Sequence, residues 1–371
     1  MKGLRILVIG GGIGGLTSAI ALRGAGFEVD VIERDPDWAV YGVGIIQQSN
    51  VVRAMSQLGL LDDYLDAAFG FDFVEVYAPT GARLARIPSP KLAEAYPANL
   101  GIGRPALHKV LGDRTLGSGA NVKLGVTATA FDDDGSKVRV SLSDETEADY
   151  DLVIGADGLY SSTRQAIFPD AARPEFTGQG VWRYNLPKPA ALDSLHAYAG
   201  PIGIGLVPLS GETMYIYLVT PEPGNPRYAQ EGLAERMRAK LEGAPAEIAA
   251  LAAGITDDRA VVYKPLEWMF LDGDWHKGRI VLLGDAVHAT TPHLGQGAGM
   301  AIEDGIVLAE ELARAADPES AFKAYRDRRF ERCRYIVEAS RAIGESQLGT
   351  REPIDYAHAT QQMFDVAAEP I

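Results

Sequence analysis

The stretch LRILVIGGGIGGLTSAIAL, residues 4–22, decides the fold of this chain. Its first six residues are apolar apart from one arginine, which predicts a short buried strand, and the small-residue run that follows the glycines predicts a helix. Between strand and helix lie Gly10, Gly12 and Gly15, in the spacing G-x-G-x-x-G. In such a unit these glycines allow a tight turn, a close backbone approach to a pyrophosphate, and close packing of helix on strand.

A second predicted strand, residues 28–32, ends in Glu33, an acidic residue roughly 20 positions beyond the glycine loop. An acidic side chain there can hold the two hydroxyls of a ribose, so the segment predicts a dinucleotide site. By their place beside the loop and the acid, Ile13, Gly14 and Arg34 are expected to belong to the same site. The loop alone does not decide between NAD and FAD.

The composition limits the class of partner. The 371 residues carry 35 Lys or Arg against 50 Asp or Glu, a formal net charge of −15. Nucleic acid and anionic membranes repel an acidic chain without a basic patch, so we expect a small-molecule partner. The sequence shows no signal-peptide pattern and no long apolar stretch, and the single cysteine, Cys333, excludes a disulfide framework or a cysteine-rich metal site. We expect a cytoplasmic monomer or homodimer without a metal.

The predicted fold is α/β, with a Rossmann-like nucleotide-binding domain, a second domain inserted in two pieces, and a C-terminal helical segment. Alternating strands and helices indicate the first domain. Alternating apolar and polar side chains indicate that the inserted substrate domain is mostly an antiparallel β-sheet. The predicted division is 1–70, 100–175 and 272–345 for the nucleotide-binding domain, 71–99 and 176–271 for the substrate domain, and 346–371 for a C-terminal tail.

Three local expectations concern loops and hairpins. Residues 41–50, YGVGIIQQSN, interrupt the pattern and predict a loop, including Gly44, pressed against a flat ligand. Residues 71–87 alternate around a Pro-Thr-Gly turn and predict a β-hairpin. Residues 122–124 and 138–142 predict a second hairpin around the acidic turn DDDGS.

A second glycine site follows in RIVLLGDAVHATTPHLGQGAGMAIEDG, residues 279–305. Its buried strand leads to Asp285, whose carboxylate would lie at the sheet edge where ligands of open α/β folds bind and could accept hydrogen bonds from a polyol. A turn with little side-chain bulk then precedes a helix, whose N-terminus favours negative charge. This turn consists of Gly295, Gln296, Gly297, Ala298 and Gly299.

Together with Arg104 in GRPALHKVL and Asp157 in IGADGLYSSTR, these motifs resemble the single-component FAD-dependent aromatic hydroxylases of the p-hydroxybenzoate hydroxylase type. The resemblance covers residues 1 to about 345, and TTPHLGQGAGMAIED is most similar to the salicylate and hydroxynicotinate monooxygenase branch. It implies FAD, NAD(P)H and molecular oxygen. The implied reaction is hydroxylation of a small aromatic or N-heteroaromatic substrate through a flavin C4a-hydroperoxide.

The resemblance also implies roles for individual residues. Glu33 would bind the adenosine ribose, and Arg104 would bind the pyrophosphate or ribityl region. Asp157 would lie at the flavin, and Asp285 would bind the ribityl chain. The segment 295–299 would lie under the isoalloxazine ring, where backbone N–H groups can stabilise the negative charge of the reduced ring.

On the substrate side, His293 is the candidate base, because an imidazole with an unperturbed pKa of about 6.5 accepts a proton near neutral pH. It also resembles the histidine in the same loop of hydroxynicotinate monooxygenase. The alternative is a histidine that braces the loop by hydrogen bonds. Tyr215 is the second candidate, Pro292 would fix the loop, and Gln296 would contact the substrate or cap the helix.

The predicted antiparallel sheet offers walls for a ring substrate. Trp182, Tyr215 and Tyr217 are candidate wall residues or ordinary core aromatics. Arg183 would bind a carboxylate, or would form a solvated pair on the other face of the sheet, since strand neighbours point to opposite faces. Leu206 stands where 3-hydroxybenzoate hydroxylases carry a histidine, which argues against that substrate.

Two other classes of function remain open at this point. One is a FAD-dependent dehydrogenase or reductase of the same fold that does not use oxygen, which a measurement of oxygen uptake with NAD(P)H would separate from a monooxygenase. The other is a non-enzymatic NAD-binding module, which would be colourless where a FAD protein is yellow. The second leaves Asp285 and the second glycine loop without a purpose.

Overall fold

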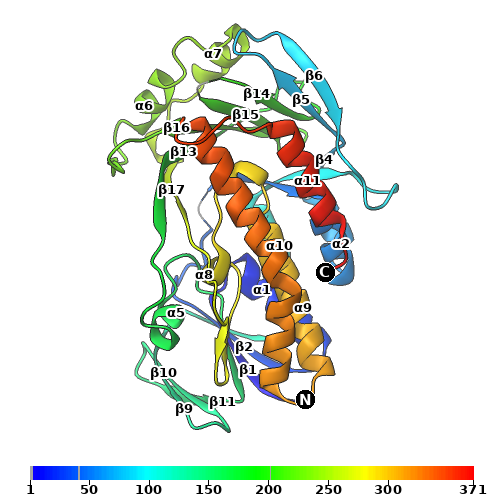
Figure 1. The fold of residues 1–371 in the computed structure, drawn as a ribbon, viewed down its shortest axis with the longest axis vertical. Coiled ribbons are helices and arrows are strands. Elements are labelled where there is room, and N and C mark those ends of the chain that lie inside the picture. Colours follow the sequence, from blue (N-terminus) through cyan, green and yellow to red (C-terminus); the bar gives the residue numbers. More distant parts are fainter. Residues whose placement is uncertain (1–2, 41, 201) are drawn as a thin grey trace.

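The computed structural model describes residues 3–40, 42–200 and 202–371. Two regions are arranged along its long axis: one contains a parallel sheet, and the other contains a larger, mainly antiparallel sheet (Figure 1). The long helix α10, Pro318–Gln347, runs along both of them. In the described parts of the chain, no helix is long and apolar enough to cross a membrane.

The first sheet has six strands in the order β18-β19-β12-β1-β2-β8. At its centre, β1, Arg5–Ile9, pairs in parallel with β2 and β12. The residues from Ile6 to Ile9 are at most 2 % exposed, because helices and a small second sheet share one core with them. The other strands are β2, Glu28–Glu33, β8, Asn121–Leu124, β12, Leu152–Gly155, β18, His276–Lys277, and β19, Ile280–Leu282.

One expected hairpin differs in the structure. Residues 122–124 lie in β8, which pairs in parallel with β2 at the edge of the six-stranded sheet. The hairpin partner of β10, Val138–Leu142, is instead β9, Ala128–Asp133, and β11, Glu147–Tyr150, completes a three-stranded sheet. The acidic turn is therefore a hairpin turn, but the strand before it was missed because its side chains are mostly exposed.

The second region is built on a seven-stranded sheet in the order β17-β13-β16-β15-β14-β5-β6. The expected hairpin of residues 71–87 is confirmed as the antiparallel pair β5 and β6, and β5 joins β14 in parallel. One face packs on α6, Leu233–Ala239, and α7, Ala246–Ala252. The strands are β5, Phe73–Tyr77, β6, Arg83–Pro88, β13, Glu175–Pro187, β14, Leu195–Tyr198, β15, Gly203–Pro208, β16, Thr213–Pro221, and β17, Val262–Trp268.

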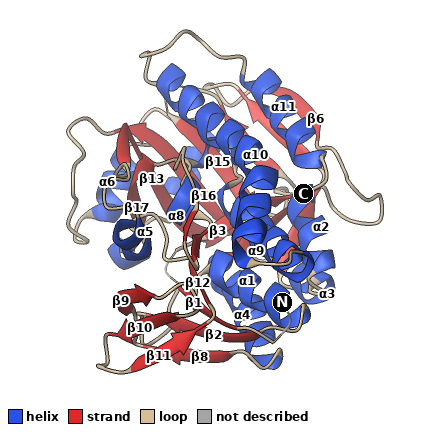
Figure 2. Ribbon diagram, turned by 60° about the horizontal axis from the view of Figure 1, so that its bottom comes forward, coloured by secondary structure: helices blue, strands red, loops and turns tan. Residues whose placement is uncertain are grey.

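A small sheet in the order β3-β7-β4 lies where the two regions meet (Figure 2). Its strands are β3, Gly44–Gln48, β4, Ala68–Phe71, and β7, Asn99–Gly103. Most of the expected loop 41–50 is therefore the strand β3 and the start of a helix, and Tyr41 lies outside the described residues. A Cβ at Gly101 would lie 1.9 Å from the carbonyl oxygen of Pro208, so this glycine lets β7 approach the end of β15.

The remaining helices cover the six-stranded sheet and the junction (Figure 2). The glycine loop leads into α1, Ile13–Gly24, and the second glycine loop leads into α9, Gly297–Arg314, which packs on α1. The others are α2, Ser49–Gln57, α3, Leu61–Asp66, α4, Arg104–Gly117, α5, Ser162–Ile167, α8, Asp285–His288, α11, Tyr356–Ala368, and the short 3-10 helices Asp258–Ala260 and Pro292–Leu294.

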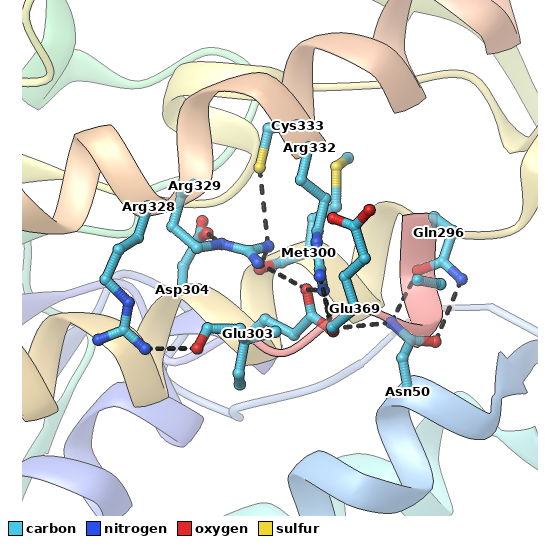
Figure 3. A network of polar contacts seen from close by, with 12 residues as sticks. Asn50, Gln296, Met300, Glu303, Asp304, Arg328, Arg329, Arg332, Cys333 and Glu369 are labelled. Carbon is cyan, nitrogen blue, oxygen red and sulfur yellow. Dashed lines mark hydrogen bonds and ion pairs between the residues drawn. The ribbon is translucent and has the colours of Figure 1, made fainter. Parts of the chain in front are cut away.

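A buried ionic network joins α2, α9 and α10 (Figure 3). Arg329 of α10 donates to Asp304 at 2.8 Å and to Glu303 at 2.7 Å, both on α9. Asn50 of α2 donates to Glu303 at 3.1 Å. Burial alone would raise the pKa of Asp304, but the neighbouring His288 and Arg329 lower it to about 2. The carboxylate is therefore ionised, and the network holds these helices in fixed positions at the base of the second glycine loop.

Candidate functional site

A cavity of about 1070 Å³ lies between the two regions. Its walls come from the two glycine loops, from β3 and from one face of the seven-stranded sheet, so residues far apart in the sequence meet here. The predicted site residues that line it are Gly12, Ile13, Gly14, Gly44, Arg104, Tyr215, Asp285, Pro292, His293, Gly295, Gly297 and Ala298.

The first glycine loop has an open backbone at the start of α1. A side chain at Gly12 would meet no atom within 4 Å, so this position faces free space in the cavity. The other two glycines serve packing. A Cβ at Gly10 would lie 2.4 Å from the carbonyl oxygen of Ala156, and a Cβ at Gly15 would lie 1.9 Å from that of Gly10. The backbone is therefore tightly packed at Gly10 and Gly15, whereas Gly12 faces the open space of the cavity.

Glu33 lies beside this loop, outside the cavity lining. Its carboxylate oxygens accept hydrogen bonds from the backbone N–H of Gly11 at 2.8 Å and of Asp35 at 2.9 Å. Trp38 Nε1 donates to the carbonyl oxygen of Gly11 at 3.0 Å, and His108 Nε2 lies 3.0 Å from the same oxygen. A carboxylate has further lone pairs, so Glu33 can fix the loop and still accept a ribose hydroxyl. Trp38 and His108 were missed because no spacing in the sequence marks them.

Two charged side chains face the cavity without a protein partner. Within the described part of the chain, neither the Asp285 carboxylate nor the Arg104 guanidinium makes a side-chain hydrogen bond or ion pair. Burial raises the pKa of Asp285 above its usual value, while His288 and Arg104 act in the opposite direction. Charged groups left unpaired inside a protein are costly, so these two mark places where a ligand supplies the hydrogen bonds.

The second glycine loop only partly faces the cavity. Gly295 has φ of +67°, a left-handed conformation that favours glycine, and it lines the cavity together with Gly297 and Ala298. Gly299 points elsewhere: a Cβ there would lie 2.8 Å from Gln296 Oε1 and 3.1 Å from a valine of α2. Its small size serves the packing of α9 on α2, which corrects the expectation that it lies under the ring system.

Gln296 does not line the cavity, in contrast to the expected substrate contact. Its buried amide accepts a hydrogen bond from Asn50 Nδ2 at 3.1 Å and donates to Asn50 Oδ1 (Figure 3). It also donates to Gln48 Oε1. Gln48 Nε2 in turn donates to the carbonyl oxygen of Leu294 at 3.2 Å. The side chain of Gln296 is thus engaged in fixing the loop on β3 and α2.

His293 lies in the cavity wall with both ring nitrogens hydrogen bonded. Nδ1 is 2.8 Å from Thr291 Oγ1, and Nε2 is 3.1 Å from Gln347 Oε1. Because the Gln347 carbonyl oxygen accepts, Nε2 carries the proton and Nδ1 accepts from the threonine hydroxyl. Burial lowers the pKa of His293 to about 4, although the Gln347 hydrogen bond opposes this, so the ring is neutral near pH 7. These contacts favour the bracing alternative.

The sheet register decides which expected wall residues face the cavity. Arg183, Tyr215 and Tyr217 do so. Trp182 and Leu206 are completely buried on the opposite face, in the core with α6 and α7. Trp182 is therefore a core aromatic. Because Leu206 does not face the cavity, its identity does not bear on the substrate, which corrects the argument against a 3-hydroxybenzoate-like ligand.

The wall formed by these residues is cationic and phenolic. No described residue makes a hydrogen bond or ion pair with the Arg183 guanidinium. Burial and the nearby Arg104 lower the pKa of Arg183 to about 10, so it stays charged near neutral pH. Burial also raises the pKa of Tyr215 to about 12, so its hydroxyl stays protonated and can donate a hydrogen bond. The ring of Tyr215 packs against Gly44, where a Cβ would lie 2.7 Å from it.

Arg34 and Asp157, two further expected cofactor residues, also lie outside the cavity lining. Arg34 is exposed just after β2. Asp157 accepts hydrogen bonds from Ser161 Oγ at 2.5 Å and from the backbone N–H and the hydroxyl of Thr163 at 3.0 Å each, so its carboxylate holds the start of α5. The residues on either side of Asp157 do line the cavity, so the main chain and not the carboxylate borders it.

The C-terminal segment also lines the cavity, which the sequence did not indicate. Phe364 and Met363 of α11 belong to its wall. Arg53 of α2 donates to the carbonyl oxygens of Ala367 at 3.2 Å and Ala368 at 3.0 Å and so anchors the end of α11. The spacing of small and apolar residues in this segment could have shown a helix, but not the surface on which it packs.

Comparison with known proteins gives concordant matches over nearly the whole chain. Residues 4–340 match a family model described as FAD binding domain. The chain is 31% identical over 346 residues to the putative FAD-dependent monooxygenase YetM of Bacillus subtilis, covering 92% of this chain and 94% of that one. It is 31% identical over 390 residues to 6-hydroxynicotinate 3-monooxygenase of Bordetella bronchiseptica, covering 99% and 97%.

A solved structure is similar over the same length. A variant of HpxO from Klebsiella pneumoniae, in complex with FAD, superimposes with a TM-score of 0.85 at 25% identity and covers 99% of this chain and 95% of that one. The two-region architecture is therefore that of a known FAD-binding fold.

Proposed function

The chain belongs to the FAD-binding-domain family of FAD-dependent monooxygenases, and from this premise we propose that it uses NAD(P)H and O2 to hydroxylate a small aromatic or N-heteroaromatic substrate. The proposal is carried by one observation. The same cavity is bordered by an open glycine loop suited to a dinucleotide and by a sheet wall with the unpaired guanidinium of Arg183 and the protonated phenol of Tyr215. We also propose that the protein acts in the cytoplasm as a monomer or homodimer.

The residues present fit FAD. Gly12 leaves its backbone accessible at the N-terminus of α1, where N–H groups and the helix dipole favour a pyrophosphate. Asp285 offers carboxylate oxygens for ribityl hydroxyls, and Arg104 offers a positive charge. We assign the ribose to Glu33, which already holds the loop through Gly11. When bound and reduced by a nicotinamide nucleotide, FAD supplies the chemistry that activates oxygen.

The second glycine loop provides electrostatic stabilisation beside this site. Gly297 and Ala298 begin the 18-residue helix α9, so their backbone N–H groups lack partners within the helix and face the cavity. Donors fixed in advance at a helix N-terminus stabilise negative charge without reorganisation. Pro292 and the hydrogen-bonded His293 keep the loop in this position.

On the substrate side, we assign to Arg183 the stabilisation of an ionised ring hydroxyl. An opposite charge close to a ring hydroxyl lowers the pKa of that hydroxyl, and an ionised hydroxyl makes the ring richer in electrons. Tyr215 cannot act as a base near pH 7, because its pKa is about 12, but it can donate a hydrogen bond that orients the ring. Water takes up the proton of the substrate hydroxyl as the substrate binds, because the positive charge of Arg183 favours the ionised form, and no histidine base is needed.

The deciding experiment is a screen of hydroxylated and amino-substituted aromatic and pyridine carboxylic acids for stimulated NAD(P)H oxidation. Oxygen consumption and product identity are measured in the same reactions. We expect at least one compound to give a ring-hydroxylated product with one O2 consumed per NAD(P)H. Oxidation of NAD(P)H without oxygen consumption, with a reduced organic product, would identify a reductase of the same fold instead.

A further inference from the structure

One row of residues crosses the cavity face of the seven-stranded sheet. Residues directly opposite on neighbouring strands lie on the same face, so the register defines the row. It runs through β13, β16, β15, β14, β5 and β6 as Arg183, Tyr217, Gly205, Ala197, Val76 and Ala85. All of these except Gly205, which the ring of Tyr217 covers, line the cavity.

The two ends of this row differ in chemistry. At the β13 end stand a guanidinium and a phenol. On β14, β5 and β6, most of the lining side chains are alanines, valines, a leucine and an isoleucine, while Tyr198 of β14 and Ser89, just after β6, also line the cavity. The apolar residues on these strands are Val74, Val76, Ala85, Ile87, Leu195 and Ala197.

On β5, the charged residue is more deeply buried than the apolar residues on either side of it, the reverse of the usual pattern on a strand with one solvated face. Val74 and Val76 are only partly buried and face the cavity, whereas Glu75 between them is 3 % exposed on the opposite face. Its carboxylate pairs there with Arg86 at 3.1 Å and Arg83 at 3.5 Å. A sheet that covers its carboxylate and leaves its valines uncovered inside a cavity has a surface suited to an apolar ligand.

The C-terminal segment forms the other wall of this part of the cavity. Ile354, Met363 and Phe364 line it together with the polar residues Asp355, Thr360 and Gln361, and α11 lies beside β6 in both views (Figures 1 and 2). The end of α11 is fixed, because Arg332 donates to the carbonyl oxygens of Glu369 at 2.7 Å and Pro370 at 3.1 Å. The space between sheet and helix is therefore a channel, apolar on the sheet side and mixed on the helix side, that continues from the phenolic wall to the edge strand β6.

We propose that this channel holds an apolar chain carried by the substrate. The substrate class is then an aromatic or heteroaromatic ring with an unbranched alkyl substituent, whose ring lies at Arg183 and Tyr215 and whose chain runs toward Ala85. From Tyr217 to Val76 the row spans three strand spacings, about 14 Å in all, which leaves room for a chain of several carbons. This inference rests on the proposed function for the placement of the ring.

The test uses the FAD-loaded protein and a series of 4-alkylphenols from methyl to octyl. Their dissociation constants are measured from the change in flavin absorbance. Burial of each methylene in the channel should lower Kd about fourfold, equivalent to about 0.8 kcal/mol. A Kd that does not depend on chain length, or the absence of binding throughout the series, overturns the proposal.

Two neighbouring substitutions on β6 locate the chain. Ala85→Phe places a ring in the channel and should abolish most of the gain between methyl and octyl. Leu84→Phe is the matched control, since Leu84 is 63 % exposed and points away from the cavity, and the gain should persist. FAD content and melting temperature confirm that both variants fold. If Ala85→Phe keeps the full gain, the chain lies elsewhere and the proposal is wrong.

Product analysis separates this inference from the proposed function. A chain-dependent Kd without hydroxylation of any phenol or acid tested supports the channel and contradicts the proposed reaction. Hydroxylation with a Kd that is flat across the series supports the reaction and contradicts the channel.

Discussion

Replacement of Gly12 by alanine should separate FAD binding from folding. The backbone there has φ of −83° and ψ of −174°, which any residue adopts, and the added Cβ meets no protein atom within 4 Å. Loss of a glycine N-cap and reduced freedom of the unfolded chain act in opposite directions, each by less than about 1 kcal/mol. The melting temperature of the apoprotein should therefore change by no more than a few degrees.

The loss of FAD affinity follows from the place that the methyl group takes. It occupies the space through which the pyrophosphate approaches the helix N-terminus. A hydrogen bond to a charged group contributes about 1.5–3 kcal/mol, so loss of one such contact weakens FAD binding by about 10- to 150-fold. Titration of the apoprotein, followed by quenching of flavin fluorescence, measures this change.

The matched control is Gly24→Ala, at the other end of the same helix. A Cβ at Gly24 also meets no atom within 4 Å, but this residue does not line the cavity. The control should bind FAD as the parent does. An unchanged FAD affinity in Gly12→Ala would refute the assignment of the pyrophosphate to this loop, and an equal loss in both variants would show that the helix and not the contact is responsible.

Three further substitutions test the unpaired and neutral groups of the cavity. Asp285→Ala should weaken FAD binding by about 1–3 kcal/mol through loss of hydroxyl contacts. The same change should stabilise the apoprotein at pH 7, because a carboxyl whose pKa is raised by burial destabilises the folded state once it is ionised. Calorimetry of the apoprotein checks the sign. Arg183→Gln should raise KM for an ionised ring substrate about 10- to 100-fold, with partial recovery in Arg183→Lys and an unchanged Kd for FAD. His293→Asn should leave the pH profile of hydroxylation unchanged from pH 6 to 9. Because the folded-state pKa of His293 is about 4 and the unfolded value is 6.5, the parent should lose ~1–3 kcal/mol of stability relative to this variant as the pH falls from 6.5 to 4. If the stability difference between parent and variant does not change over this range, the His293 ring is not buried in its neutral form. If the variant loses hydroxylation rate at pH 7 but keeps FAD, His293 is the base after all.

The sequence predicts best what depends on local spacing. Gly10, Gly12 and Gly15 have their geometry because strand, turn and helix follow one another directly, so three positions suffice to define the loop. The position of Asp285 after a buried strand is of the same kind, since the carboxyl ends of parallel strands meet at one sheet edge.

Side-chain direction in the second glycine loop could not be predicted in this way. Gln296 turns away from the cavity because Asn50 and Gln48, almost 250 positions earlier, offer it a complete set of amide partners. Gly299 is small for the same reason, as α2 packs against it. A pattern within one segment contains no information on a partner of that kind.

For the sheet wall, the sequence likewise could not predict which face of the sheet adjoins the cavity. Alternation along β13 establishes that Arg183 and Trp182 point to opposite faces, but not which face adjoins the cavity. Only the packing of α6 and α7 on the Trp182 face decides this. A shift of one residue would have buried the arginine and exposed the tryptophan.

The charges in the cavity explain why the fold retains groups that do not stabilise it. The chain has a formal net charge of −15, yet the Arg104 and Arg183 guanidiniums face the cavity without an ion pair to any described residue, and Arg104 lies near enough to Arg183 to lower its pKa. Two unpaired cations close together cost the apoprotein free energy. Surface charges more than about 10 Å away are screened at ordinary ionic strength, so a ligand inside the cavity experiences mainly the local charges, which are these two cations and the Asp285 carboxylate. We therefore expect the arrangement to be favourable when anions are present, with the proposed pyrophosphate at one guanidinium and the proposed ionised ring at the other.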